Sequence, residues 1–211
     1  MNSITNNLIN YIASVFNSIS KPIAPNIVRG HLRSISTNIE DGIARFISEV
    51  LPQKGYKLFL DPSIHVKDKQ GKTHLLRPDL LIVKEESAEK RVVAYIEIKS
   101  NMGWCRDAHV VITDIINNHE LFLDNKTLTC EFSTQKGEVE EVIYDSGVKL
   151  YLLSLTGSNC SDTKHDNNKQ YASANNVKHY VLFTGWYDSL QPKDVDSFMD
   201  DLRSSFLTCT P

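Results

Sequence analysis

Long apolar runs are absent from this chain of 211 residues. No stretch approaches the ~20 apolar residues that a membrane-spanning helix needs. Residues 1–7 also lack the basic start and the continuous apolar core of a secretory signal peptide. We therefore expect a protein that has no membrane contacts and acts in the cytoplasm.

Cysteine is scarce, and its spacing argues against a metal cluster. The four cysteines, Cys105, Cys130, Cys160 and Cys209, are separated by 25, 30 and 49 positions, which fits neither a zinc site nor an iron–sulfur site. We expect reduced structural thiols, because the cytoplasm disfavours disulfides. The chain also lacks Gly-x-x-x-x-Gly-Lys-Ser/Thr, the loop that cradles nucleotide phosphates, so we expect no nucleotide cofactor.

The composition is that of an ordinary globular protein, with 41% hydrophobic and 23% charged residues. The length suffices for one domain with a sizeable core. We find no internal repeat and no domain boundary. We therefore expect a single domain over residues 1–211, with an N-terminal helical arm over 1–25 and a catalytic core over 26–211.

The net charge of −3 does not by itself favour nucleic-acid binding. The charges are unevenly distributed, however. Residues 1–39 contain three basic residues and no acid, whereas the rest of the chain contains 20 basic and 26 acidic residues. A basic arm on an acidic body can contact a phosphate backbone locally, although chance explains three charges in a short segment equally well.

Hydrophobic periodicity predicts an α/β protein, in which a central mixed sheet carries helices on its faces. One polar segment, 157–176, is nearly free of aliphatic residues, and we predict a long loop that is either a mobile surface loop or a loop that orders on a ligand. Residues 69–72 predict a hairpin turn, and residues 125–146 a hairpin insertion. The predicted helices are 4–19, 27–51 with a break near 34–37, 106–122 and 194–206, and the predicted strands are 56–66 with an interruption at 61–62, 74–83, 91–100, 150–155 and 179–184.

Charged residues accompany two apolar runs of this predicted sheet. Asp79 precedes the apolar run that ends at Val83, and Glu97 and Lys99 lie within the run that begins at Val92. Ionised side chains are rarely buried unless they are paired or bound to a metal. Side chains alternate along a strand, so Glu97 and Lys99 share one face at a separation of about 6–7 Å. If the two strands form a hairpin, Asp79 and Glu97 meet across it.

Oxygen ligands of this kind suit Mg²⁺, which one or two carboxylates hold together with water and substrate phosphate. The backbone carbonyl of Ile98 adds a further ligand. The metal would activate a bound water and neutralise charge on a phosphate. Lys99, protonated between two carboxylates, would position that water or stabilise the developing charge. The alternative is structural, because Glu-x-Lys is a common surface ion pair and Pro-Asp is a common turn.

The combination of Pro78-Asp79 with Glu97-Ile98-Lys99 resembles the PD-(D/E)xK nuclease superfamily, also called restriction-endonuclease-like. The resemblance implies a mixed sheet flanked by helices and Mg²⁺-dependent cleavage of DNA, with Mn²⁺ as a substitute. Many members add a glutamate from the helix before the sheet. Glu40 is the candidate, because its spacing from Ile43 and Ile47 places it on their inward face. Alternatively, Thr37-x-x-Glu40 is a capping box at the start of the helix.

The resemblance is strongest to type II restriction endonucleases, so we expect cleavage of double-stranded DNA by a homodimer whose two-fold symmetry matches a palindromic site. Two alternatives stay open: a structure-specific or repair nuclease such as a junction resolvase or a nickase, and a non-catalytic DNA-binding module on the same fold. Polar residues beside the predicted helix and strand are candidate DNA contacts, although a solvated surface explains each of them as well. They are His31, Arg33, Ser34, Ser100, Asn101 and Arg106.

Overall fold

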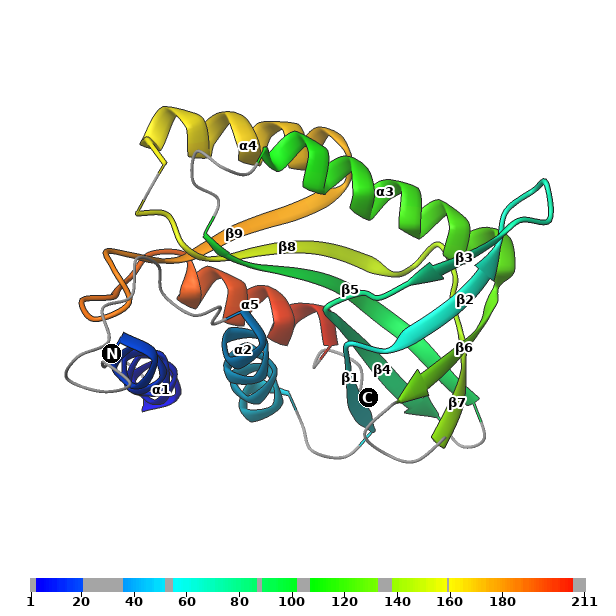
Figure 1. Cartoon of the computed structure of the whole chain (residues 1–211), viewed down its shortest axis with the longest axis horizontal. Coiled ribbons are helices and arrows are strands. Elements are labelled where there is room, and N and C mark those ends of the chain that lie inside the picture. The colour runs from blue at the N-terminus through cyan, green and yellow to red at the C-terminus, as the bar shows by residue number, and fades with distance from the viewer. Residues whose placement is uncertain are drawn as a thin grey trace, which may run out of the picture.

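The computed structural model describes residues 3–20, 36–51, 55–86, 89–101, 107–132, 138–158 and 160–206, apart from the side chains of residues 19 and 20. In these ranges, ten strands form one mixed sheet (Figure 1). The strands are β1 (Tyr56–Leu60), β2 (Ser63–Lys67), β3 (Thr73–Leu76), β4 (Leu80–Glu86), β5 (Glu89–Asn101), β6 (Thr127–Phe132), β7 (Glu138–Ile143), β8 (Lys149–Thr156), β9 (Val177–Thr184) and β10 (Gln191–Pro192).

The long strand β5 is the branch point of the sheet. It pairs with β4 in antiparallel orientation and with β8 in parallel orientation, and Arg91 near its start also pairs with Ile143 of β7. The path β10-β9-β8-β5-β7-β6-β2-β3 accounts for eight strands, and β4 and β1 extend from β5 off that path. The expected mixed α/β sheet is therefore confirmed.

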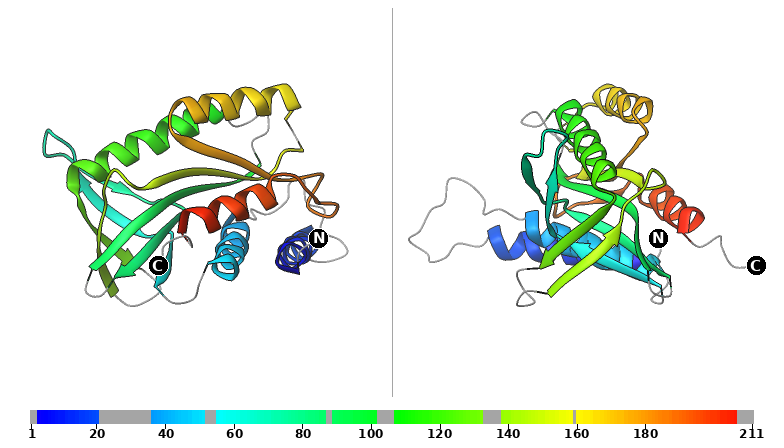
Figure 2. Two further views of the ribbon diagram at one scale, coloured as in Figure 1. Left: turned by 180° about the vertical axis from the view of Figure 1, so that it is seen from behind. Right: turned by 90° about the vertical axis from the view of Figure 1, so that its right-hand side faces the viewer.

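Helices cover both faces of this sheet. On one face lie α1 (Ser3–Ser20), α2 (Ser36–Val50) and α5 (Val195–Phe206), and on the other lie α3 (Ala108–Asn125) and α4 (Asp162–Ala174), as Figure 2 shows from two sides. None of the helices in the described ranges is both long and apolar enough to cross a membrane. The predicted N-terminal helix is confirmed as α1, and its buried residues Leu8 and Ile12 join the same core as α2.

Alternation along β5 divides the core into two clusters. Ile96 and Ile98 face α2 and α5, whereas Tyr95 faces α3, and all three are almost completely buried. Burial on both faces is typical of strands that helices cover on each side. The sheet therefore fixes the direction of each β5 side chain, including the charged ones.

Most predicted elements are confirmed, including the hairpin turn between β2 and β3 and the hairpin insertion, which is β6 with β7. Residues 27–35 of the second predicted helix lie outside the described residues. The single strand predicted over 74–83 is wrong, because the chain forms β3 and β4 there and leaves the ladder at residues 77–79. Pro78 has no N–H to donate, which ends the pairing of the first strand before the second begins.

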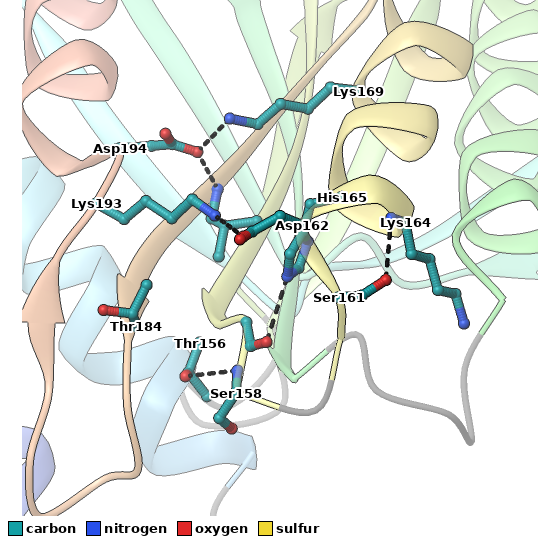
Figure 3. A network of polar contacts seen from close by, with 12 residues as sticks. Thr156, Ser158, Ser161, Asp162, Lys164, His165, Lys169, Thr184, Lys193 and Asp194 are labelled. Carbon is teal, nitrogen blue, oxygen red and sulfur yellow. Dashed lines mark hydrogen bonds and ion pairs between the residues drawn. The ribbon is translucent and has the colours of Figure 1, made fainter.

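The long loop predicted over 157–176 is also wrong, because helix α4 occupies most of this segment. Ser161 caps the helix by accepting a hydrogen bond from the Lys164 N–H (Figure 3). The buried face consists of His165, Asn168 and Ala172, at the i, i+3 and i+7 spacing of a helix. Two of these three residues are polar, so the segment shows no hydrophobic periodicity.

Aromatic packing around α5 supplies the first testable prediction. Phe198 is fully buried, and its ring centroid lies 5.4 Å from that of Tyr180 and 6.0 Å from that of Tyr151. We expect Phe198→Ala to lower the free energy of unfolding by about 3–5 kcal/mol, because the cavity cannot refill. Urea unfolding followed by circular dichroism measures this loss. Trp186→Ala is the control, since that side chain is 53% exposed, and equal losses would contradict the assigned core.

Candidate active site

Asp79, Glu97 and Lys99 meet at the junction of β4 and β5. Leu80 pairs with Ile96, and this register places Asp79 opposite Glu97. The Lys99 ammonium donates to Asp79 Oδ2 at 3.2 Å and also to Glu97 Oε1. The three side chains are 16%, 18% and 18% exposed, so the cluster is partly open to solvent. The three residues expected to act together are therefore neighbours.

A backbone contact fixes the Asp79 carboxylate. Extended by two residues, the register places Pro78 opposite Ile98. In an antiparallel ladder, a residue directs its N–H and its carbonyl oxygen to the same neighbour. Because proline has no N–H, a ladder pair cannot form here, and Asp79 Oδ2 accepts the Ile98 N–H at 2.6 Å instead. The Ile98 carbonyl oxygen consequently points to the side of β5 on which Asp79 lies.

A buried tyrosine supports the second carboxylate. The Tyr95 hydroxyl donates to Glu97 Oε2 at 3.4 Å and accepts from the Asn118 amide of α3 at 3.2 Å. Tyr95 is two residues before Glu97 and therefore shares its face of the strand. We did not identify Tyr95 or Asn118 from the sequence. The i−2 spacing from Glu97 is a signal for Tyr95, whereas the position of Asn118 depends on how α3 packs.

The protonation of the cluster follows from burial and from the surrounding charges. Burial raises the pKa of Glu97 to about 7, with the Asp79 carboxylate as the second cause, while Lys99 and the Tyr95 hydroxyl oppose the shift. Burial alone would lower the pKa of Lys99, but the two carboxylates outweigh it and raise that pKa. Lys99 is therefore a stable cation at neutral pH, as expected from the sequence.

Glu40 of α2 lies within electrostatic reach of this cluster. Its pKa is raised to about 7 by burial first, then by Asp79 and Asp61, while Lys99 opposes the shift. Helix α2 already includes Ser36, which places Thr37 inside the first turn and not at the N-cap position of a capping box. The start of α2 therefore argues against the capping box, and Glu40 interacts electrostatically with Asp79 and Lys99.

Asp61 is a fourth acid that we did not identify from the sequence. Its backbone N–H donates to the Asp79 carbonyl oxygen at 3.1 Å. Its φ of 48° is one that Asp tolerates better than most residues. Burial raises the pKa of its carboxyl group, and Asp79 raises it further. The Asp-Pro step that interrupts the predicted strand is the signal that could have identified it.

The structure describes two of the six residues that we expect to contact DNA. Ser100 and Asn101 follow Lys99 at the end of β5 and are partly exposed. Within the described part of the chain, the Asn101 Oδ1 atom is buried and has no hydrogen-bond partner. The other candidates, His31, Arg33, Ser34 and Arg106, lie outside the described residues.

The donor set fits a hard divalent cation. The available donor atoms are all oxygens, from the carboxylates of Asp79 and Glu97 and the Ile98 carbonyl, with the Glu40 carboxylate within electrostatic reach. These acids outnumber the one lysine of the cluster, Lys99. Within the described ranges, no group of three or more His, Cys, Asp or Glu side chains has the arrangement of a metal site. A Mg²⁺ ion here would depend on two carboxylates, a carbonyl oxygen and water. The chain matches no protein-family model, no curated protein and no solved structure.

The crowding of acids predicts a pH-dependent stability. Because the Glu40 pKa is raised from 4.5 to about 7, the folded state binds a proton between those values that the unfolded state does not. Stability therefore falls as pH rises through this window. In EDTA, Glu40→Gln should raise Tm by a few degrees at pH 8 and much less at pH 5.

Thermal unfolding at both pH values measures the effect. Glu49→Gln is the matched control, since Glu49 is an acid on the exposed side of the same helix and pairs with Arg45. A gain for Glu40→Gln that is the same at both pH values would contradict the raised pKa.

Proposed function

We propose that this protein is a Mg²⁺-dependent endonuclease that hydrolyses phosphodiester bonds of double-stranded DNA, as a sequence-specific type II restriction enzyme. The observation that carries the proposal is the cluster of Asp79, Glu97 and Lys99 at one end of neighbouring strands. The excess of carboxylates in this cluster can bind a cation, and the Lys99 ammonium can stabilise negative charge on a phosphate. The resemblance of these residues to the PD-(D/E)xK motif supports the choice of DNA.

Each residue of the cluster has a distinct part in this proposal. Asp79, Glu97 and the Ile98 carbonyl would hold Mg²⁺, with Glu40 as the further ligand that the resemblance implies and Mn²⁺ as a substitute. When bound, the ion would lower the pKa of a water and neutralise charge on the phosphate. Lys99, protonated at neutral pH, orients the attacking water and stabilises the charge that develops as the phosphorus–oxygen bond forms.

Removal of either central carboxylate tests the proposal. We expect the wild type to cut plasmid or phage DNA into discrete fragments with Mg²⁺ and not with EDTA. Asp79→Ala and Glu97→Ala should each lower the rate at least ~100-fold, because each removes a cation ligand and part of the charge arrangement. Gel electrophoresis of the products measures this. Glu140→Ala is the control, since Glu140 also pairs tightly with a lysine, Lys90, at the other end of β5.

Other outcomes discriminate between the alternatives. A smear or a nick would favour a repair nuclease, and cleavage of branched DNA alone would favour a junction-specific enzyme. Failure to cut duplex and branched DNA, without any binding of Mg²⁺ or Mn²⁺, would contradict hydrolysis and leave a non-catalytic binding module. Strong residual activity of Asp79→Ala would contradict the assigned site.

The hydroxyl of Tyr95 should matter for cation binding, because it orients Glu97. Loss of such a supporting contact typically lowers metal affinity by about 10–100-fold. We expect Tyr95→Phe to weaken Mn²⁺ binding in this range, measured by calorimetry. Tyr144→Phe is the control, because Tyr144 is equally buried and its hydroxyl also contacts α3, through His119 at 2.8 Å. Equal effects of both changes would indicate a purely structural role.

A further inference from the structure

A basic two-stranded ribbon extends from the candidate active site. We define the ribbon as residues 63–77, which comprise β2, the turn, β3 and Arg77. It contains four basic residues and one acid, Asp68, whereas the whole chain has a net charge of −3. Apart from this ribbon and residues 1–39, the chain contains 16 basic and 25 acidic residues, so the ribbon is one of two basic segments on an acidic chain. The basic residues of the ribbon are Lys67, Lys69, Lys72 and Arg77.

Both ends of the ribbon lie at the catalytic cluster. The residue pair before β2 is Asp61-Pro62, and the Asp61 N–H donates to the carbonyl oxygen of Asp79 at 3.1 Å. At the other end, β3 stops three residues before Asp79. Figure 1 shows the turn between β2 and β3 projecting beyond the end of α3. Five strand residues span about 17 Å, so the ribbon reaches well beyond the cluster along a bound molecule.

One face of the ribbon is free of the core. Ile64 and Val66 of β2 are buried, whereas His65 and Lys67 are exposed. The register pairs His65 with Leu75 and Lys67 with Thr73, so these four residues share the exposed face. Leu75 is 48% exposed and lies opposite His65. This face therefore combines a lysine, a histidine ring, a hydroxyl and an apolar side chain.

Side-chain hydrogen bonds support the turn of the ribbon and the end of β2. The Asp68 carboxylate accepts the backbone N–H groups of Gln70 and Lys72, each at 2.9 Å, and its second oxygen lies 2.8 Å from the ring of His74. At the end of β2, the Asn125 amide binds both the N–H and the carbonyl oxygen of Lys67, at 3.1 and 2.9 Å. A prebuilt element loses little conformational entropy when it binds.

We infer that this ribbon binds the backbone of duplex DNA next to the cluster and presents its exposed face to a groove. The choice of duplex DNA rests on the proposed function. The major groove admits a two-stranded ribbon, lysines contact phosphates, and an apolar side chain contacts the thymine methyl group. The acidic residues elsewhere in the chain repel DNA, which favours contact at basic segments such as this ribbon.

Salt-dependent binding tests the inference without catalysis. Fluorescence anisotropy with a labelled 30-base-pair duplex measures the affinity in EDTA at several salt concentrations. It compares the wild type with the double variant Lys67→Gln/Lys72→Gln. Each phosphate contact contributes about 0.9 to the slope of log K against log salt. We expect the double variant to bind about 10-fold more weakly at low salt and to lower the slope by about 1–2.

The charge-matched control is the double variant Arg45→Gln/Arg203→Gln, which removes two exposed cations from α2 and α5, outside the ribbon. Thermal unfolding should be the same for all variants, since the replaced side chains are on the surface. Equal affinity and equal slope for the two double variants would overturn the inference. An unchanged slope with a changed oligomeric state would assign the ribbon to self-association and overturn it as well.

A cleavage assay separates this inference from the proposed function. If the wild type cuts DNA and the ribbon variant keeps the full salt slope of binding, only the assignment of the ribbon is wrong. If the wild type binds duplex DNA through the ribbon but does not cut it with Mg²⁺, the proposed hydrolysis is wrong and the ribbon assignment stands.

Discussion

The Lys99 ammonium between Asp79 and Glu97 is the interaction on which the site depends. Two carboxylates that face each other across neighbouring strands repel, and the Asp79 carboxylate contributes to the raised pKa of Glu97. The lysine offsets that repulsion and keeps both carboxylates close together at one end of β5. The pairing of β4 with β5 sets this arrangement, because a slip of one residue would turn Asp79 to the opposite face.

The surroundings leave the cluster with more acid than one lysine can neutralise. Glu40 from α2 and Asp61 from the turn before β2 add to Asp79 and Glu97, and the pKa values of Glu40 and Glu97 are both raised to about 7. Such an arrangement lowers stability at neutral pH unless a cation binds. Strain of this kind is typical of functional sites, where a protein gives up some stability for chemistry.

Two predicted segments were wrong, one because of a proline and the other because a helix buries polar residues. The strand predicted over 74–83 is two strands, because Pro78 interrupts the ladder and Asp79 uses its side chain to bind the Ile98 N–H. The loop predicted over 157–176 contains α4, whose buried face includes His165 and Asn168. A hydrophobic pattern cannot reveal a helix that buries polar side chains.

The sequence alone determined the mixed α/β class, most element positions and the three central residues of the site, because strand alternation and the apolar runs around Asp79, Glu97 and Lys99 are local properties. Glu40 was already a candidate from the resemblance and from its spacing along the predicted helix. Only the tertiary structure placed Asp61 beside Asp79 and Asn118 against Tyr95. These contacts join the turn before β2 and α3 to the site, and their geometry depends on how the elements pack on the sheet. Local patterns carry no information on that packing.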